Sequence, residues 1–303
     1  MMTSRFTPIF VALTLLGLTH FAEAKKGISG MSEYQKGNEL FDQKQYDQAI
    51  AEFNKAIQAN PKQASFYTNR GYAYLHLNKL DEAVADFAKA IELDDKEYGA
   101  YLGRAQVYLA QRFWDQALPD TDHAVQLKPD QSVAYKFRGL AEIGLNQWDK
   151  AVADLTLAIE KDPNDLQNYE RRAFAYRGLK NYQAAIADCN VVLEKNPSDF
   201  DALTSRGYVY SLNKDYEKAI ADFEAALKIK PGDTSSEQNL QYARQNLAAK
   251  NAPPTPTPTP TPEERTLLTP MNVGIAIVVI LIIAVVVRLL TRGKEEPTSG
   301  RIR

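Results

Sequence analysis

The 303-residue chain has very few of the residues that most often build catalytic or metal sites. It contains one cysteine, Cys189, and three histidines. A disulfide within one chain is therefore excluded, and His76 and His123 stand far in sequence from any cysteine or histidine at metal-ligand spacing. No phosphate-binding loop, HExxH or GxSxG motif occurs. These absences predict a protein that is not an enzyme, with no metal, no cofactor and an apolar, buried Cys189.

An excess of one charge is also missing. The chain has 36 Lys and Arg against 38 Asp and Glu, a net charge of −2. Nucleic-acid binding needs a surplus of positive charge, so we expect no nucleic-acid partner. The overall composition, 45% hydrophobic and 24% charged, is ordinary for a folded protein. The informative biases lie at the two ends and in a repeated middle.

The first 24 residues have the pattern of a secretory signal peptide. Arg5 precedes a mostly apolar run over 9–21, and Ala22-Glu23-Ala24 fits a small-x-small cleavage site. The run is shorter than the ~20 residues that a membrane-spanning helix needs. We therefore predict a signal peptide over 1–24, followed by a short N-terminal segment, 25–29. An uncleaved anchor or a buried helix is the alternative.

A second apolar segment lies near the C-terminus. Residues 266–287 carry no charge, and 273–287 are apolar throughout, which predicts a transmembrane helix over 270–290. Basic residues follow this segment closely. Because Lys and Arg mark the cytoplasmic side, we expect a single-pass membrane protein with a cytoplasmic tail, 291–303. The part before the helix is then periplasmic or extracellular.

A linker rich in proline and threonine, 251–265, precedes this segment. Pro-rich linkers are extended, at ~3.1 Å per residue, so the linker is predicted to be a spacer between a folded domain and the membrane. A glycosylated stalk is the alternative. The outline of the chain resembles a cell-wall-sorted surface protein, but no LPxTG-type pentapeptide is present. A lipid-anchor signal is disfavoured because a polar tail follows the apolar segment.

The middle of the chain repeats every 34 residues. Proline recurs at intervals of 34 or 68 residues from Pro61 to Pro231, and alanine occupies the twentieth place of every unit from Ala49 to Ala219. Small residues also hold the eighth place, and bulky residues the seventeenth. Counting back from the prolines gives the units 30–63, 64–97, 98–131, 132–165, 166–199 and 200–233.

This phasing resembles the tetratricopeptide repeat (TPR) family, whose 34-residue unit is a helix–turn–helix. The resemblance implies an all-α fold, a right-handed α-solenoid of six TPR units in which stacked units share a continuous core. Residues 234–250 repeat Leu240, Ala243 and Leu247 at helical spacing, which predicts a capping helix. The C-terminal transmembrane helix completes the predicted fold.

Opposite charges recur at two places in every unit. Place seven is Lys36, Arg70, Arg104, Arg138, Arg172 and Arg206, and place twenty-three is Glu52, Asp86, Asp120, Asp154, Asp188 and Asp222. The pattern allows a charged track for a ligand or a ladder of ion pairs between helices. We favour the ladder because such regular repetition suits architecture, and we expect exposed pairs that contribute ~0–1 kcal/mol each.

Unit three is predicted to be the softest. Gly99 and Gly103 fall in its first helix, and each costs about 1 kcal/mol relative to alanine in a helix interior. Pro119 falls in its second helix, where it removes a backbone hydrogen bond if it lies past the first turn. We therefore predict local flexibility in this unit. The alternative is that the neighbouring units hold it rigid.

The resemblance also implies a binding surface, because the first helices of TPR units line a concave groove. The binding candidates at groove-facing places are Tyr34, Asn38, Asn69, Tyr72, Lys136, Arg171, Phe174, Arg177 and Tyr208. Phe41, His76, Phe137 and Glu170 also occupy groove-facing places. Aromatic residues and arginine dominate interface energetics, although ordinary packing between helices is the alternative for each. The carboxylate clamp of TPR co-chaperones is not supported, since only two asparagines match its pattern.

The combined prediction is a non-enzymatic scaffold of the bacterial envelope. It is exported, tethered to the membrane through 270–290, and binds a protein or an extended peptide segment in the TPR groove. The alternative is a structural or assembly subunit of an envelope enzyme or transport complex whose active site lies in another chain. A receptor for a small ligand would instead need one deep pocket.

Overall fold

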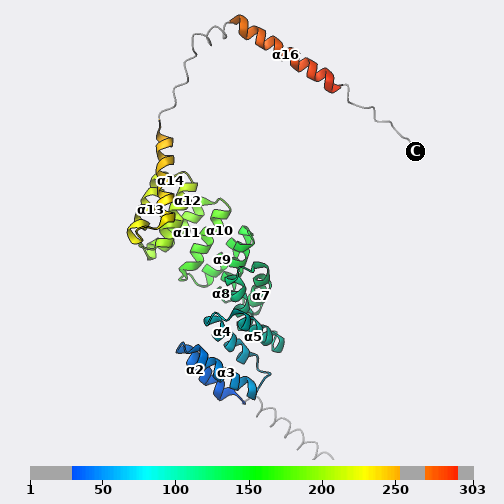
Figure 1. Ribbon diagram of the computed structural model, residues 1–303, viewed down its shortest axis with the longest axis vertical. Helices are drawn as coiled ribbons and strands as arrows, with labels where there is room; N and C mark the ends of the chain where they lie inside the picture. Colours follow the sequence, from blue (N-terminus) through cyan, green and yellow to red (C-terminus); the bar gives the residue numbers. More distant parts are fainter. Residues whose placement is uncertain (1–28, 253–269, 293–303) are drawn as a thin grey trace, which may run out of the picture. The chain divides into compact units, whose positions relative to one another are not determined.

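The computed structural model describes residues 29–252 and 270–292. The predicted signal peptide 1–24 lies outside these ranges, as do most of the linker 251–265 and most of the tail 291–303. Every regular element in the described ranges is a helix, and none is a strand (Figure 1). The chain divides into two compact units, 1–249 and 250–303, which are described separately.

Helices α2 to α13 of the first unit follow one another as six pairs. The pairs are α2 (Met31–Asp42) and α3 (Tyr46–Ala59), α4 (Ala64–His76) and α5 (Leu80–Leu93), α6 (Tyr98–Ala110) and α7 (Trp114–Leu127), α8 (Ser132–Gly144) and α9 (Trp148–Lys161), α10 (Leu166–Gly178) and α11 (Tyr182–Lys195), and α12 (Phe200–Leu212) and α13 (Tyr216–Ile229). Each helix packs on its neighbours in sequence, and first helices contact the first helices of adjacent pairs. The predicted all-helical repeat solenoid is confirmed.

A single helix, α14 (Thr234–Asn251), follows the sixth pair. Its Leu240 and Ala243 are buried against Ala219 and Phe223 of α13. The apolar face of the final pair is thereby covered, which is the task of a capping helix in a repeat array.

The turn inside each pair uses a left-handed residue at place fifteen. These residues are Lys44, Asn78, Arg112, Asn146, Lys180 and Lys214, with φ between 57° and 63°. In the first pair the Lys44 N–H donates to the Phe41 carbonyl, and the Gln45 N–H donates to the Leu40 carbonyl. A left-handed residue of this kind satisfies the free carbonyls at a helix end. It reverses the chain so that the two helices lie antiparallel.

The small residues at place eight mark where aromatic rings press on the first helix. A Cβ added to Gly37 would lie 2.5 Å from Cε1 of Phe53, and one added to Gly71 would lie 2.8 Å from Cε1 of Phe87. Phe53 and Phe87 are fully buried, as is the alanine at place twenty in every pair. The sequence pattern of small and bulky residues therefore corresponds to the core of the solenoid.

Unit three shows why a helical glycine is not always a weak point. Gly103 packs directly against the ring of Phe87 from the preceding pair, and an added Cβ would overlap that ring. Pro119 lies inside α7, and the helix continues past it to Leu127. The glycine at 103 is thus required for packing between pairs, and flexibility of this unit stays a prediction.

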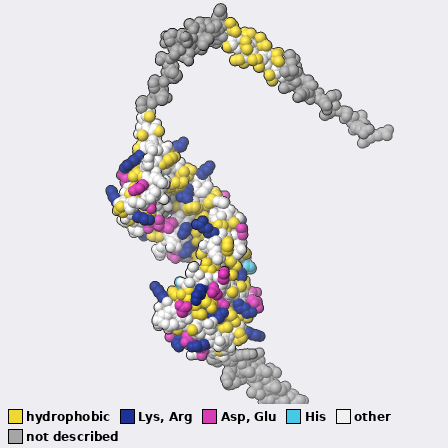
Figure 2. Space-filling model, viewed as in Figure 1, with side chains coloured by type: hydrophobic (Ala, Val, Ile, Leu, Met, Phe, Trp, Pro, Cys, Tyr) yellow, Lys and Arg dark blue, Asp and Glu magenta, His cyan; other side chains and the backbone are white. Residues whose placement is uncertain are grey.

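The second unit contains α16 (Pro270–Arg292), which covers the predicted helix 270–290. Side chains are described over 274–288, and the apolar ones among them are exposed (Figure 2), with Ile280 at 65%. No helix in the described parts of the chain has both the length and the apolar character that crossing a membrane requires. The helix is therefore found, and its membrane-spanning role stays a prediction.

Candidate functional site

Four of the predicted groove residues meet between α2 and α4. A cavity of about 500 Å³, here called the N-terminal pocket, is lined by Asn38, Phe41, Asp42, Asn69, Tyr72 and His76. The Asn69 side-chain amide donates to the Asn38 amide oxygen at 2.7 Å and to the Tyr34 hydroxyl at 2.9 Å. The Tyr72 hydroxyl donates to the Gly99 carbonyl at 2.8 Å. Asn38, Asn69 and Tyr72 in this pocket are thus already hydrogen-bonded within the protein.

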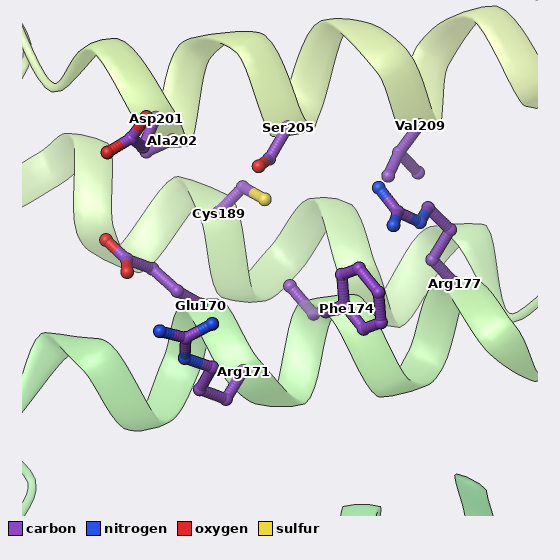
Figure 3. Close-up of a pocket in the computed structure, with 10 residues that line it drawn as sticks. Glu170, Arg171, Phe174, Arg177, Cys189, Asp201, Ala202, Ser205 and Val209 are labelled. Atoms are coloured by element: carbon purple, nitrogen blue, oxygen red, sulfur yellow. The ribbon is translucent and has the colours of Figure 1, made fainter. Parts of the chain in front are cut away.

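A second cavity of about 210 Å³, here called the C-terminal pocket, is formed by α10, α11 and α12. Glu170, Arg171, Phe174 and Arg177, all at predicted groove-facing places, line it together with residues that the prediction did not include: Cys189, Asp201 and Ser205. Figure 3 shows Glu170 and Asp201 at one end of this pocket and Arg177 at the other. The end with Glu170 and Asp201 also holds Arg171, whereas Arg177 lies at the other, basic end, apart from both carboxyl groups.

Aromatic rings frame the basic end. The Arg177 guanidinium carbon lies 4.2 Å from the centroid of the Phe174 ring and 5.1 Å from that of the Tyr208 ring. Phe174 and Tyr208 remain 42% and 38% exposed. Burial lowers the pKa of Arg177 from its usual range, because a low-dielectric surrounding disfavours the charged form. This arginine keeps its charge at neutral pH, held between two accessible rings.

Two other groups of the C-terminal pocket respond to the same burial. Burial and then the neighbouring Asp199 raise the pKa of Glu170. Burial raises the pKa of the Cys189 thiol to about 12. Cys189 is 2% exposed, which confirms the predicted buried cysteine, and it is protonated at neutral pH and therefore a poor nucleophile. The prediction missed only that its side chain reaches the wall of a pocket.

Sequence position alone gave a partial signal for the residues that were missed. Asp201 and Ser205 occupy groove-facing places of their units, so the TPR pattern places them near the groove. Cys189 stands at a core place of a second helix, where nothing in the pattern indicates contact with a cavity.

Lys136, the remaining groove candidate, lines neither pocket. Its ammonium group lies 2.9 Å from a carboxylate oxygen of Asp165, and both side chains are largely buried. Asp165 is the residue that caps the N-terminus of α10, accepting from the Gln167 N–H. Lys136 therefore connects α8 to the start of the next first helix, and its charge is already neutralised.

The recurrent opposite charges form the predicted ladder. Every cation at place seven contacts the carboxylate sixteen residues later, beginning with Lys36 and Glu52 at 2.8 Å. The five arginines each bind both carboxylate oxygens through Nε and Nη2, at 2.5 to 2.9 Å. The expectation of exposed pairs is wrong, since the acidic partners are only 3–8% exposed. They sit between the two helices of a pair, where the rest of the pair shields them from water.

The ladder also joins neighbouring units. The Nη1 atoms of Arg70, Arg138, Arg172 and Arg206 donate to Asn54, Asp122, Thr156 and Asn190, which occupy place twenty-five of the preceding unit. Arg104 is the exception, because the corresponding residue is Ala88, which has no acceptor side chain. These contacts support the architectural interpretation of the charges over a ligand track.

Glu142 is a buried acidic residue that does not belong to the ladder. Glu142 stands at place eleven, which is Leu or Tyr in the other units. It is 5% exposed, and its Oε2 atom has no hydrogen-bond partner among the described residues. Burial, and then the charge of Asp154, raise its pKa to about 8. Across the described ranges, no group of three or more His, Cys, Asp or Glu residues is placed to hold a metal ion.

Comparison with known families agrees with this geometry. The tetratricopeptide repeat description matches residues 34–98, 102–165 and 200–233, together more than half of the chain. The chain belongs to the tetratricopeptide repeat family. The paired helices, the small residues at places eight and twenty, and the groove between first helices are then features of a TPR array.

Curated relatives resemble only short parts of this TPR protein. The Hsp70-Hsp90 organizing protein of Triticum aestivum is 37% identical over 76 residues, which are 22% of this chain and 13% of that protein. Hsp70-Hsp90 organizing protein 1 of Glycine max is 44% identical over 46 residues, 15% of this chain and 8% of the relative. The chain thus spans a small fraction of these relatives, and the likeness is one of repeats.

Solved structures resemble the array over a longer stretch. YrrB, described as a TPR protein with an unusual peptide-binding site, superposes with a TM-score of 0.56 at 25% identity and covers 62% of this chain and 97% of its own. PilF of Pseudomonas aeruginosa gives a TM-score of 0.62 at 15% identity, covering 71% of this chain and 98% of that one. The second comparison shows the fold alone.

Proposed function

We propose that this TPR protein is a non-enzymatic scaffold that binds a protein or an extended peptide segment in the groove lined by its first helices. TPR proteins are protein-binding scaffolds. The observation that carries the proposal here is the pair of exposed aromatic rings, Phe174 and Tyr208, that contact Arg177 of the C-terminal pocket. Aromatic residues and arginine supply most of the binding energy in protein interfaces.

A binding role also fits the titratable groups of the pockets better than catalysis does. A nucleophile or general base needs a pKa matched to its task and a positioned partner. Burial raises the pKa of Cys189 to about 12, away from that range. Glu142, whose pKa is also raised, lies inside the solenoid with an unbonded oxygen. Neither group is placed to attack or deprotonate a substrate.

The likeness to Hsp70-Hsp90 organizing proteins does not extend the proposal to chaperone tails. Of the positively charged and amide residues that such a carboxylate clamp needs, only Asn38 and Asn69 are present at the matching places. The Asn69 amide group is already bonded to Asn38 and Tyr34. The partner is therefore proposed by the chemistry of the C-terminal pocket rather than by the names of relatives.

The proposal includes export and tethering to a bacterial membrane. It rests on the signal-peptide pattern of 1–24, the spacer 251–265, the apolar run 273–287 and the basic tail. A tether would raise the effective concentration of the scaffold toward partners in the same membrane. External protease added to spheroplasts should then digest the repeats and spare the tail 291–303, which an epitope at the C-terminus would report. Digestion of the epitope under the same conditions would contradict this topology.

Capture of partners tests the scaffold function itself. The full chain would be immobilised in detergent and exposed to solubilised envelope proteins of the source cell, next to a Phe174→Ala/Tyr208→Ala variant. Tyr242→Ala on α14 is the control, since Tyr242 is an even more exposed aromatic residue and lies far from the groove residues in sequence. We expect partners that the wild type and control retain and the double variant loses. Equal retention by all three would place binding elsewhere, and no specific partner on any column would contradict the scaffold function.

A further inference from the structure

Arg177 differs from the arginines that hold the array together. Each arginine of the ladder binds a carboxylate through two nitrogen atoms. Arg177 is also partly buried, yet among the described residues it makes no hydrogen bond and no ion pair. Its contacts are the two aromatic rings of Phe174 and Tyr208. Partial burial disfavours the charged guanidinium, and charges that lose contact with water are normally paired.

The aromatic contacts leave the hydrogen-bonding capacity of this guanidinium unused. Cation–π attraction acts over the face of a ring, whereas the five N–H donors of arginine lie in the plane of the guanidinium and point outward from its edge. A carboxylate matches two of these donors at once. Arg177 is therefore held in place by its neighbours while its donors stay available.

The acidic residues of the same pocket do not serve as its partners. Glu170 and Asp201 lie at the opposite end of the cavity from Arg177, with Cys189 and Ser205 between the two ends (Figure 3). Arg171 lies beside Glu170 and lowers the pKa that burial raises. An occupant that brings a negative charge to Arg177 would be attracted there, and a second negative charge near Glu170 and Asp201 would be repelled.

We propose that the C-terminal pocket binds an acidic side chain of the partner segment, with its carboxylate on Arg177 between Phe174 and Tyr208. The inference rests on the proposed scaffold function and names the partner's chemistry. The segment carries a single Asp or Glu with neutral or basic neighbours, because a polyacidic run would meet Glu170 and Asp201. We commit to a side-chain carboxylate rather than a chain terminus because α10 and α12 lie within the array, where an extended segment passes across the pocket.

Synthetic peptides test this inference without knowledge of the partner. The probes are fluorescein-labelled, C-terminally amidated 12-residue peptides with one Glu, one Leu and one Lys at varied separations on a Gly-Ser background. Each has a twin with Gln in place of Glu, and anisotropy is measured with the full chain in detergent. We expect at least one Glu peptide to bind about ten- to hundredfold more tightly than its twin, the effect of one hydrogen bond to a charged group.

Three variants locate the effect. Arg177→Gln is expected to abolish the preference for Glu, and Arg177→Lys to keep part of it, because the positive charge remains. Lys195→Gln removes the same charge from an exposed position of α11 in the same repeat and should leave the preference unchanged. Helical circular dichroism and the melting temperature confirm that each variant is folded.

The inference fails if no Glu peptide is preferred over its twin, or if the preference survives in Arg177→Gln. Equally tight binding of a Gln peptide with a free C-terminus would assign the site to a chain end instead, which also overturns the proposal. Partners captured equally by wild type and Arg177→Gln would leave the scaffold function intact and remove this inference alone. A loss of all partners from the wild-type column would remove the scaffold function itself.

Discussion

The N-terminal and C-terminal pockets share places six, nine and twelve of the repeat, yet they use their polar groups in opposite ways. Place twelve is Phe41 in the first unit and Arg177 in the fifth. In the N-terminal pocket the Asn69 amide is bonded to Asn38 and Tyr34, whereas Arg177 has no acceptor among the described residues. The shared backbone decides where a side chain stands. The identity of a few side chains then decides whether the polar groups of a pocket are already hydrogen-bonded or stay available to a partner.

The two halves of the array also differ in how their interior polar groups are exposed and paired. The first pair of the ladder is Lys36 and Glu52, and the Lys36 side chain is 61% exposed. In the fifth unit Arg172 is 16% exposed and holds both oxygens of Asp188. Five buried side-chain polar atoms have no partner among the described residues, and four of them lie between Glu142 and Ser211. Units four to six therefore carry more unpaired polar groups than units one to three.

The largest expected difference between the two ends of the array is the loss of stability when a ladder ion pair is removed. Arg172→Met leaves the buried Asp188 carboxylate without its partner, and we expect a loss of about 3–5 kcal/mol in the free energy of unfolding. Urea denaturation of the full chain in detergent measures this loss. Lys36→Met should cost much less, since Glu52 is also bonded to Lys55 at 2.9 Å and water reaches the site. Equal losses in the two variants would contradict the contrast.

The raised pKa of Glu142 in unit four predicts that the stability of the protein depends on pH. Its pKa is about 8 in the folded protein against an ordinary value of 4.5, so the folded state binds the extra proton between these values. Its contribution to stability is full below about pH 4.5 and is lost as the pH rises through about 8. Asp154 adds to the rise, whereas Arg138 and Lys150 oppose it.

Glu142→Gln should remove this dependence. At pH 9 the variant is expected to be more stable than the wild type by about 1–3 kcal/mol, because a neutral amide replaces a buried charge with an unbonded oxygen. Melting temperatures at pH 5, 7 and 9 give the comparison. The exposed Glu160→Gln on α9 should follow the wild-type profile. An unchanged profile in Glu142→Gln would show that another group titrates.

The smallest expected effects on stability come from two asparagines, one in each half of the array. Asn168 is fully buried, and neither its amide nitrogen nor its amide oxygen has a hydrogen-bond partner within 29–252 or 270–292. Units three, four and six have a buried alanine at the same place. Asn168→Ala should therefore stabilise the protein by about 1 kcal/mol, through removal of unpaired polar atoms and better helix propensity.

Asn69→Ala should have the opposite sign. Its amide donates two hydrogen bonds at the N-terminal pocket, and their loss is expected to destabilise the protein by about 1–2 kcal/mol. Both variants are measured by the same urea denaturation. Destabilisation by both substitutions would mean that Asn168 has a bonding partner in solution.

The repeat period made the architecture predictable, because each unit restates the same small and bulky residues at the same places. The ion-pair ladder and the burial of Cys189 followed from that phasing. The sequence could not show which side chains of one unit contact those of the next. Gly103 looked like a weak point when judged by helix propensity, and only its contact with Phe87 of the preceding unit shows why it is glycine.

The candidate site was predictable to a similar depth. The groove-facing places anticipated Phe174, Arg177 and Tyr208, which the structure brings together. They also included Lys136, whose charge is neutralised by Asp165. The pairing state of a charge depends on side chains from other units, which a 34-residue pattern does not encode. The burial of the ladder carboxylates was missed for the same reason, since it depends on how the helices pack around them.

The bond from each ladder arginine to the preceding unit bears on how the array would respond to force. Load applied along a solenoid passes through its joints in series, since each unit contacts only its neighbours. Four of the five joints are fastened by Nη1 of an arginine at place seven. The joint between units two and three has Ala88 where the fastening acceptor would be. This joint is held instead by the hydrogen bond from the Tyr72 hydroxyl to the Gly99 carbonyl and by Phe87 packed on Gly103. A neutral hydrogen bond is weaker than one made by a charged group, so an array pulled from its two ends should part first at this joint.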